Sequence, residues 1–451
     1  MQILSFIPSS LRRHIDSRPN LQRVITNTGW LIFERIFRLG IGLVVSILVA
    51  RHLQPENFGI LSYVNSVIAF LGTFVYLGLS GLVVRDIVRF PDQKELLLGT
   101  TFSLKIAGSA FAFVVMICLA LFTHDADNKE FWIFFIIGLS LFARPFETID
   151  FWFQSQVQSK YSVIAKSAAF ISFAALKILL VFQGASVVAF AVASSLEIFL
   201  ASIFLIFIYR YNGFSLLKWR VRISKAKELL SQSWIIILSG FLGMVNLKVD
   251  QIMLRWLSGA AEVGIYSVAV TFSEVWYFIP NVIVMSVYPR LIELKKTQNS
   301  LYDKKLQQIF DMLFAIAFLV ALAMTLIAGP LIPFLYTDTY AGSASILIIH
   351  VWAGIFMFMR AMFSKWVFIE DALFFSLISH GSGAVLNVLL NLILIPNFGG
   401  KGTAVATLLS YAASSYFFLF FYPKTRPLAV KMSKSIILPL RLIVYRSRTW
   451  A

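Results

Sequence analysis

Cysteine and charged residues are scarce in this sequence, and both shortages narrow what the protein can be. Its one cysteine, Cys118, lies inside an apolar run, so we expect neither a disulfide bond nor a cysteine metal site. Only 14% of the residues are charged and 59% are hydrophobic, whereas a soluble domain carries about 25% charged residues. The histidines show no ligand spacing such as HExxH, and no GxxxxGKS or GxxxxGKT pattern marks an ATP site. These absences predict a protein with no metal and no cofactor.

Apolar runs recur from one end of the chain to the other, and each is long enough to cross a bilayer as an α-helix, which takes about 20 residues. The segments that connect them are too short to fold as soluble domains. The sequence therefore predicts an all-α polytopic membrane protein. We place about twelve transmembrane helices near residues 28–50, 59–84, 96–122, 130–153, 161–182, 186–209, 230–255, 262–288, 308–336, 343–369, 372–395 and 401–422.

Positive charge alternates between the connecting segments, and this pattern predicts the orientation in the membrane. Lysine and arginine gather before residue 28, at 85–94, at 210–228 and at 290–305, whereas the segment 123–130 on the opposite side is acidic. By the positive-inside rule both termini are cytoplasmic. The net charge of +17 is thus a topology signal. Because this charge is scattered over many loops, we do not expect a nucleic-acid partner.

The same charges divide the chain into five parts. The N-terminal segment has no apolar core followed by a cleavage site, so we interpret it as a retained cytoplasmic arm rather than a signal peptide. The predicted parts are a cytoplasmic arm at 1–27, a six-helix bundle at 28–210, a basic cytoplasmic linker at 211–229, a second six-helix bundle at 230–422 and a basic cytoplasmic tail at 423–451.

The two predicted bundles begin alike. The first span runs from Trp30 to Arg51 and the seventh from Trp234 to Arg255, with the same spacing. Each is followed by a leucine and then by a short turn into Gly-Ile, at 59–60 and at 264–265. Because both copies start on the cytoplasmic side, they form a parallel repeat about an axis along the membrane normal. Two bundles around a central site are typical of alternating-access transporters.

Three stretches also resemble a known family: ILVARHLQPENFGILSY at 47–63, VDQIMLRWLSGAAEVGIYSVAV at 249–270 and LNVLLNLILIPNFGGKGTAVAT at 386–407. They are similar to the polysaccharide biosynthesis or O-antigen repeat-unit flippases of the multidrug/oligosaccharidyl-lipid/polysaccharide (MOP) exporter superfamily. The resemblance implies a V-shaped protein in a bacterial inner membrane. It also implies that the substrate is an undecaprenyl-diphosphate-linked oligosaccharide, which is moved from the cytoplasmic to the outer leaflet. This oligosaccharide would be the repeat unit of a lipopolysaccharide O-antigen, a capsule or an exopolysaccharide. Candidate partners are membrane lipids, a polysaccharide polymerase and a chain-length regulator.

A diphosphate in a poorly hydrated cavity needs cations, because an unpaired anion there costs many kcal/mol. Intramembrane lysine and arginine are rare and usually functional. Alternatively, Glu34 could neutralise Arg38 four residues later, and the lysines could extend toward the interface. The candidate diphosphate-binding residues are Arg35, Arg38, Lys105, Arg144, Lys177, Lys248 and Arg360.

Acidic and amide residues inside the spans suggest two further roles. A carboxylate in a poorly solvated site can carry a proton or bind Na⁺, and an H⁺ or Na⁺ gradient could then drive transport. Alternatively, Glu147 could hold Arg144 in position. The candidates for ion coupling are Glu147, Asp150, Asp250 and Glu274. On the eleventh span Asn387 and Asn391 are candidate sugar contacts, with hydrogen bonding between helices as the alternative.

Other functions fit this sequence less well. A drug or metabolite antiporter of the same superfamily shares the two-bundle plan, but its usual cationic substrates would not need buried cations. A flippase for a peptidoglycan precursor would be expected to have two more spans. A membrane-embedded polysaccharide polymerase would need a large outer loop or an acidic pair in the first outer loop, and HLQPENFG offers neither. We therefore predict a flippase and not an enzyme.

Overall fold

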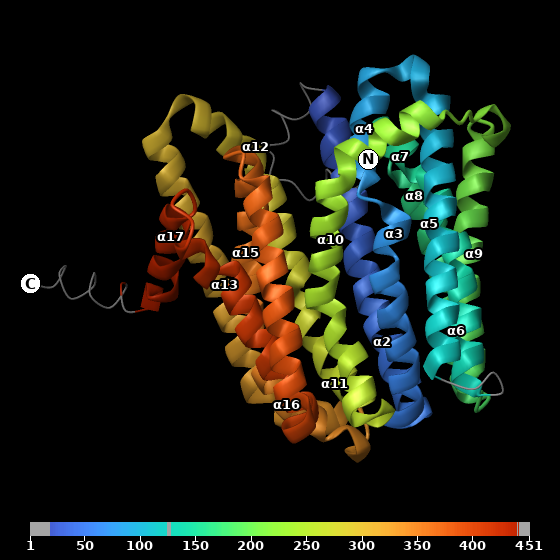
Figure 1. Ribbon diagram of the computed structural model, residues 1–451, viewed down its shortest axis with the longest axis vertical. Helices are drawn as coiled ribbons and strands as arrows, with labels where there is room; N and C mark the ends of the chain where they lie inside the picture. The colour runs from blue at the N-terminus through green and yellow to red at the C-terminus, as the bar shows by residue number, and fades with distance from the viewer. Residues whose placement is uncertain (1–18, 124–127, 440, 442–451) are drawn as a thin grey trace, which may run out of the picture. The chain divides into compact units, whose positions relative to one another are not determined.

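The computed structural model describes residues 19–123, 128–439 and 441, and within this part of the chain all regular structure is helical (Figure 1). The predicted all-α fold is thereby confirmed. Of the predicted cytoplasmic arm and tail, residues 1–18 and 442–451 lie outside the described part.

The helices form two compact units. The first unit holds the described residues before Gln54 together with Val67–Ile237, and the second holds Gln54–Ser66 and the chain from Leu238 onward. The division after Ile237 lies inside helix α10 (Ile223–Ser258), beyond the linker predicted at 211–229.

Helix α2 (Pro19–Leu71) and helix α10 contribute to both units, and the remaining elements belong to one unit each. The first unit also contains α3 (Thr73–Tyr76), α4 (Leu79–Arg89), η2 (Pro91–Gln93), α5 (Lys94–Thr123), α6 (Lys129–Leu139), η3 (Ser140–Phe142), η4 (Arg144–Glu147), α7 (Thr148–Ser155), α8 (Lys160–Phe182), α9 (Val187–Tyr211) and η5 (Leu216–Lys218). The second contains α11 (Ala260–Glu274), η6 (Val275–Tyr277), α12 (Phe278–Thr297), α13 (Asn299–Leu335), η7 (Asp338–Tyr340), α14 (Gly342–His350), α15 (Ala353–Ile369), α16 (Leu373–Ser415), η8 (Phe417–Phe420) and α17 (Arg426–Ile436).

Nine helices of the described chain are long and apolar enough to cross a membrane, or ten if the bent pair α14 and α15 counts as one span. Two of these long helical segments each contain two predicted spans. A residue with non-helical backbone angles divides each segment: Gln54, with φ 59°, in α2 and Gly399, with φ 52°, in α16. Pro55 follows the first break, and a proline cannot donate the backbone hydrogen bond that a continuing helix requires. The structure is therefore consistent with about twelve spans.

Each unit has its own apolar core. In the first, leucine, valine and aromatic side chains from α4, α5, α7 and α9 are packed together, including fully buried Leu79 and Phe153. In the second, α12, α13 and α15 surround Phe310, Phe358 and Phe363. Many large apolar side chains lie on the surface instead, for example Phe122, which is 89% exposed. An outer apolar surface is expected for helices that meet lipid rather than water.

The Gly-Ile pairs of the sequence repeat meet inside the second unit. A Cβ atom on Gly59 would lie 1.8 Å from the carbonyl oxygen of Ala260, and one on Gly264 would lie 2.1 Å from that of Pro55. Only glycine allows two helix backbones to come this close. The repeated motif therefore marks a helix crossing between α2 and α11.

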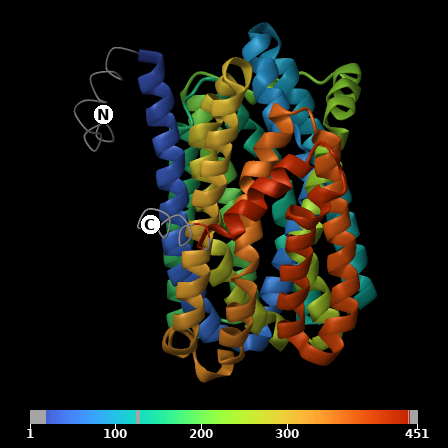
Figure 2. The same ribbon diagram turned by 90° about the vertical axis from the view of Figure 1, so that its left-hand side faces the viewer.

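Helix α17 covers part of α13, as the red helix in Figure 2 shows. Lys431 Nζ lies 3.0 Å from Asp303 Oδ1, and the Ser435 hydroxyl donates to Asp311 Oδ1 at 2.6 Å. The start of the predicted basic tail is thus part of the second unit.

Candidate functional site

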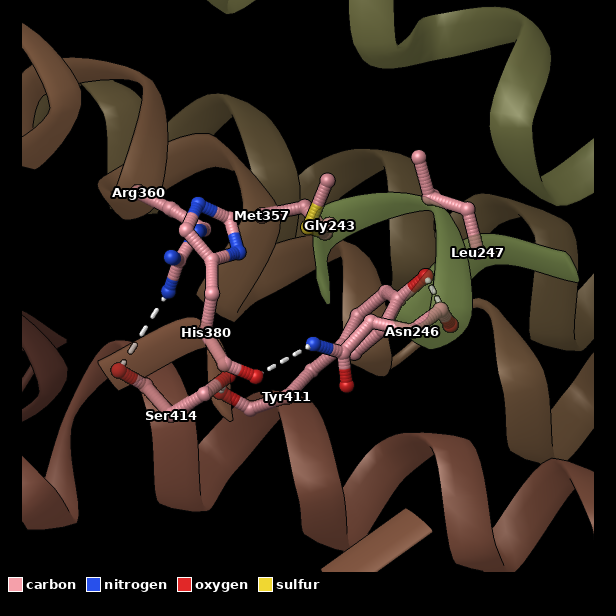
Figure 3. Close-up of a pocket in the computed structure, with 8 residues that line it drawn as sticks. All are labelled: Gly243, Asn246, Leu247, Met357, Arg360, His380, Tyr411 and Ser414. Carbon is pink, nitrogen blue, oxygen red and sulfur yellow. Dashed lines mark hydrogen bonds between the residues drawn. The ribbon is translucent and has the colours of Figure 1, made fainter. Parts of the chain in front are cut away.

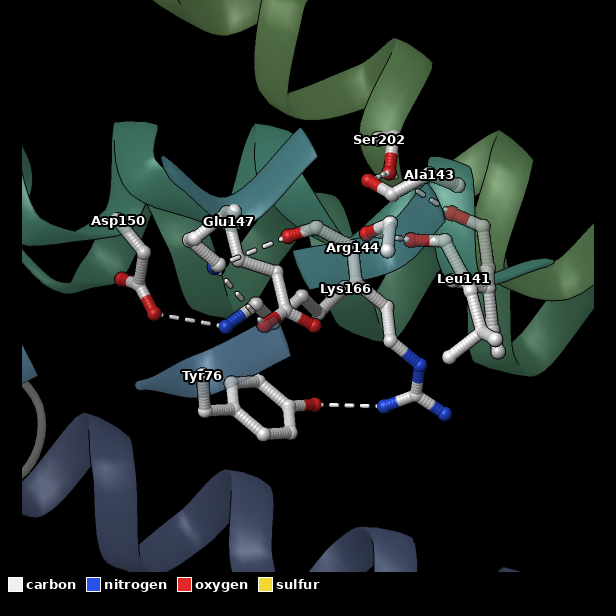
Figure 4. A network of polar contacts seen from close by, with 11 residues as sticks. Tyr76, Leu141, Ala143, Arg144, Glu147, Asp150, Lys166 and Ser202 are labelled. Atoms are coloured by element: carbon white, nitrogen blue, oxygen red, sulfur yellow. Dashed lines mark hydrogen bonds and ion pairs between the residues drawn. The ribbon is translucent and has the colours of Figure 1, made fainter. Parts of the chain in front are cut away.

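Buried polar side chains gather in the interior of each unit. In the second unit, an arginine lines a small pocket beside a histidine (Figure 3). In the first unit, lysines, an arginine and carboxylates form a network around an interruption of the fourth span (Figure 4).

The fourth span changes its hydrogen-bond pattern beside Pro145. The span predicted at 130–153 is present as Lys129–Ser155, but short 3-10 turns replace α-helix between Leu139 and Thr148. Proline has no N–H to offer the carbonyl four residues earlier, at Leu141. The hydroxyl of Ser109 donates to this carbonyl at 2.8 Å, and the hydroxyl of Ser202 donates to the carbonyl of Ala143 at 2.8 Å. Side chains of neighbouring helices thus satisfy the backbone that the break exposes.

Lys105 supports the same break. Its side chain is 0% exposed, and its ammonium group donates to the carbonyl of Arg144 at 3.1 Å and lies 3.9 Å from Glu147 Oε2. The rings of Tyr76 and Phe151 also face it, each with its centroid 5.4 Å from Nζ. A buried ammonium is tolerated when a carbonyl, a carboxylate and aromatic faces surround it.

Asp150 has a partner that the sequence did not suggest. Nζ of Lys166, on α8, lies 2.7 Å from Oδ2 of Asp150, on α7 (Figure 4). Lys166 was not among the residues predicted from the sequence. It lies inside its predicted span at 161–182, so the rule that singled out Lys105 also applies to it.

Arg144 differs from these lysines in having no acidic partner in the part of the chain that the structure describes. Its Nη1 donates to the Tyr76 hydroxyl at 2.6 Å, and its Nε is buried with no hydrogen-bond partner. Within the described residues no carboxylate forms an ion pair with this guanidinium, although Glu147 is three residues away. In Figure 4 the guanidinium points away from the Lys166–Asp150 pair. Tyr76 was not a candidate, because nothing in its sequence context distinguishes it from other tyrosines.

A small cavity of about 100 Å³ adjoins this network, with Arg38, Glu147, Lys166 and Glu197 in its wall. Arg38 Nε lies 3.0 Å from Glu34 Oε1, the pairing that the spacing of four residues allows. Arg38 also donates to the carbonyl of Lys166 at 3.3 Å.

The other two cations predicted in this unit are placed differently. Lys177 Nζ lies 2.8 Å from Glu197 Oε2, so its charge is balanced. Arg35 is exposed, and among the described residues it forms no ion pair. The first unit therefore brings together Arg38, Lys105 and Arg144, and it leaves Arg35 apart.

The second unit surrounds Asp250 with neutral donors. Asn391 Nδ2 donates to Asp250 Oδ1 at 2.7 Å, Tyr266 donates to Oδ2 at 3.1 Å, and the Thr407 hydroxyl donates to the same oxygen at 2.5 Å. Asn387 accepts from Asn391 at 3.1 Å. All five residues are buried, and three of them lie on α16. Asn387 and Asn391 thus contact an acid and each other within the helix bundle.

Lys248 and Glu274 do not join this group through any ion pair between described residues. Both are partly buried. Arg360 is 8% exposed and belongs to the pocket of Figure 3.

The sequence of this chain matches one known protein family. The model of a family described as polysaccharide biosynthesis protein matches residues 24–295, more than half of the chain. No curated protein sequence matches it.

Several solved structures are similar in fold. An inward-facing multidrug resistance MATE family transporter of the MOP superfamily gives a TM-score of 0.68 at 15% identity, covering 87% of this chain and 95% of that one. The lipid II flippase MurJ in an inward closed conformation gives 0.66 at 14% identity and covers 93% of each chain. A MOP superfamily transporter from Pyrococcus furiosus, described as having a binding pocket of reverse polarity, gives 0.58 at 14% identity, covering 91% and 96%. The chain therefore belongs to the polysaccharide biosynthesis protein family and has the fold of MOP-superfamily transporters.

Proposed function

We propose that this protein is a flippase that moves an undecaprenyl-diphosphate-linked oligosaccharide from the cytoplasmic to the outer leaflet of a bacterial inner membrane. Its family membership supports a role in polysaccharide synthesis, and the fold is one on which transporters and a lipid II flippase are built. Both termini are cytoplasmic in this proposal, and polymerase and chain-length regulator act on the exported unit.

Arg144 is the observation that carries the proposal. An arginine inside a membrane span is costly unless a partner balances its charge. Lys166 and Lys177 each have a carboxylate within 2.8 Å, whereas the described residues provide none for Arg144. A guanidinium offers a planar set of donors that fits phosphate oxygens two at a time. The diphosphate of the lipid carrier would supply the missing negative charge.

The neighbours of Arg144 fit this role. Lys105 holds the Arg144 backbone, and Tyr76 holds its guanidinium, so the side chain is oriented before the substrate arrives. Preorganisation of this kind lowers the entropy lost on binding. Arg38, near the adjoining cavity, adds a second positive charge that Glu34 only partly balances, because both side chains remain partly exposed.

Asp250 is the site that we propose for coupling to an ion gradient. Its carboxylate is buried, and the groups that hydrogen-bond to it are neutral. A proton or Na⁺ would therefore neutralise a charge that has no cationic partner among the described residues. Oxygen atoms of Asp250, Asn387 and Thr407 are the kind of ligand that Na⁺ takes, and protonation would satisfy the same carboxylate.

The test compares Arg144→Gln, Arg144→Lys and the control Arg210→Gln in cells that lack the chromosomal gene. Arg210 is an exposed arginine at the end of α9 in the same unit. We measure surface polysaccharide and the lipid-linked units on each leaflet. Arg144→Gln should abolish surface polysaccharide while complete units accumulate on the cytoplasmic leaflet; Arg144→Lys should retain part of it, and Arg210→Gln all of it.

Other outcomes would contradict the proposal in distinct ways. Unpolymerised units on the outer leaflet of the null strain would identify a polymerase. Normal surface polysaccharide in the null strain, together with sensitivity to toxic compounds, would identify a drug or metabolite antiporter. Full complementation by Arg144→Gln would remove Arg144 from the site and leave the flippase activity itself intact.

A further inference from the structure

A groove of about 340 Å³ lies between α12 and α13 of the second unit (Figure 1). Its wall consists of nine residues, all within the described part of the chain, and it contains two cations, Arg290 and Lys305, and no acid. Arg290 Nη1 lies 2.6 Å from Glu293 Oε2, one turn away on α12. Lys305 forms no ion pair with any described residue. The groove and its rim therefore have one positive charge that the protein does not balance.

Apolar side chains form most of the remaining wall. Leu291 and Leu294 are buried, at 1% and 2% exposed. Val287, Ile309 and Met312 complete the apolar part, and Met312 is 40% exposed. A concave apolar surface of this volume is large enough to hold part of a ligand. The groove therefore suits a molecule that has both a hydrocarbon part and a negative charge.

The course of α13 (Asn299–Leu335) shows at which depth the groove lies. The helix is free of charged residues from Met312 to Leu335, a run of 24 residues that is long enough to cross the hydrocarbon core. Lys305 precedes Met312 by seven residues, about 10 Å along the helix, so its flexible side chain reaches the headgroup layer. The groove thus extends from the headgroups into the hydrocarbon. In the orientation predicted from the sequence, this is the cytoplasmic leaflet.

Charge narrows the kind of lipid. A phosphodiester lipid such as phosphatidylglycerol has one negative charge, which matches the unbalanced charge of the groove. A zwitterionic lipid would bring a cationic group toward Arg290 and Lys305, and a lipid diphosphate would leave at least one negative charge without a partner. The side chain of Gln308 is exposed and forms no hydrogen bond to other described residues, so it can donate to an ester or hydroxyl oxygen of the lipid.

We propose that this groove binds one anionic phospholipid of the cytoplasmic leaflet, which joins α12 to α13 and is not transported. The phosphate lies between Arg290 and Lys305, and one acyl chain follows Val287, Ile309 and Met312 toward the bilayer centre. Basic residues at a membrane surface attract anionic headgroups in this way. The proposal goes beyond the flippase function and does not depend on it.

The binding test uses the full chain, purified in detergent and titrated with dioleoyl phosphatidylglycerol or with dioleoyl phosphatidylcholine. Native mass spectrometry counts the lipids bound at each concentration. One phosphatidylglycerol should bind at least tenfold more tightly than phosphatidylcholine. Equal affinities would overturn the proposal, because they indicate lipid that coats any membrane protein.

Two competitors distinguish the phospholipid from other phosphate compounds. Glycerol 3-phosphate should not displace phosphatidylglycerol, since it lacks the acyl chain. Displacement at equal concentration would overturn the proposal in favour of a site for free phosphate groups. Undecaprenyl diphosphate should bind more weakly than phosphatidylglycerol, and tighter binding would assign the groove to the transported lipid instead.

A pair of double variants tests the charges. Arg290→Gln with Lys305→Gln should weaken phosphatidylglycerol binding at least tenfold and leave phosphatidylcholine binding unchanged. Lys296→Gln with Lys304→Gln is the matched control, because it removes the same charge from exposed positions of the same two helices outside the groove. An equal loss in both double variants would indicate attraction by the general surface charge and overturn the site.

Ser286 offers a variant that tests the groove with its charges intact. Its exposed side chain belongs to the wall and donates only to the carbonyl of Ile283 on the same helix, so a substitution spares the fold. Ser286→Trp fills the groove and should weaken phosphatidylglycerol binding at least tenfold. Met285→Trp is the control, since Met285 is 63% exposed and lies outside the wall. Wild-type affinity in Ser286→Trp would overturn the proposal.

Discussion

Lys105 and Arg144 were predicted from the sequence to bind the same diphosphate, and in the structure their surroundings differ. Lys105 is 0% exposed, and its ammonium group is occupied by the Arg144 carbonyl and Glu147. We therefore expect Lys105→Met to act on the fold first. Removing the lysine takes a charged donor away from the buried Arg144 carbonyl, and a hydrogen bond from a charged group contributes about 1.5–3 kcal/mol. The loss of two aromatic contacts and of the Glu147 partner, which is itself 28% exposed, brings the expected destabilisation to about 2–4 kcal/mol.

Thermal unfolding of the solubilised protein, followed by size-exclusion chromatography, measures this change. A loss of 2–4 kcal/mol corresponds to a decrease in Tm of roughly 4–16 °C for a unit of this size. Lys160→Met is the control, because Lys160 is exposed at the start of α8, and its substitution should change stability by no more than about 0.5 kcal/mol.

A second substitution tests the reasoning further. Lys105→Met with Glu147→Gln removes the unpaired carboxylate as well, so it should recover part of the lost stability, but the lysine's hydrogen bond to the Arg144 carbonyl stays lost. The result that would refute the argument is a Lys105→Met protein with wild-type Tm and no transport. In that case the ammonium would contact the substrate directly, as the sequence alone suggested.

Three further predictions follow from single contacts. Gly264→Ala forces the helix crossing apart and should cost about 3 kcal/mol or more, seen as loss of monodisperse protein, while Gly240→Ala behaves as wild type; equal yields would contradict the close approach. Asp250→Asn should keep the fold but make transport into vesicles insensitive to ionophores that collapse the H⁺ or Na⁺ gradient, and continued sensitivity would remove Asp250 from coupling. Lys177→Met should impair export, because it leaves Glu197 without its cation, and the double variant Lys177→Met with Glu197→Gln should restore export. A double variant that does not restore export would indicate that Lys177 contacts the diphosphate.

Hydropathy was sufficient to predict the spans, because transfer of a long apolar run into lipid outweighs local detail. The repeat was equally informative. Gly59 and Gly264 stood out at equivalent positions of two similar segments, and they prove to lie where helix backbones are closest. The pairing of Glu34 with Arg38 was also accessible, since residues four apart on a helix are neighbours.

Contacts between helices could not be predicted in this way. Asp150 pairs with Lys166 across two helices, and no spacing rule connects residues that meet only through packing. Arg144 and Glu147 were placed together because we assumed a continuous helix at 130–153. Instead, Arg144–Glu147 form a 3-10 turn that contains Pro145, and Glu147 lies near Lys105. The proline in the sequence could have indicated the change in the helix. It could not have indicated that a serine from another helix donates to the carbonyl of Leu141, which the proline leaves without a backbone donor.

Pairing, rather than burial alone, distinguishes a residue of the scaffold from a residue of the site. Lys166 and Lys177 are balanced by carboxylates of the same unit, so they stabilise the protein whether or not a ligand is bound. Arg144 in the first unit and Arg360 in the second have buried N–H groups with no hydrogen-bond partner. A protein gains nothing for its own stability by keeping such a group in a membrane span. On this reasoning a ligand is the best explanation for each arginine, and for Arg144 it is the diphosphate of the proposed function.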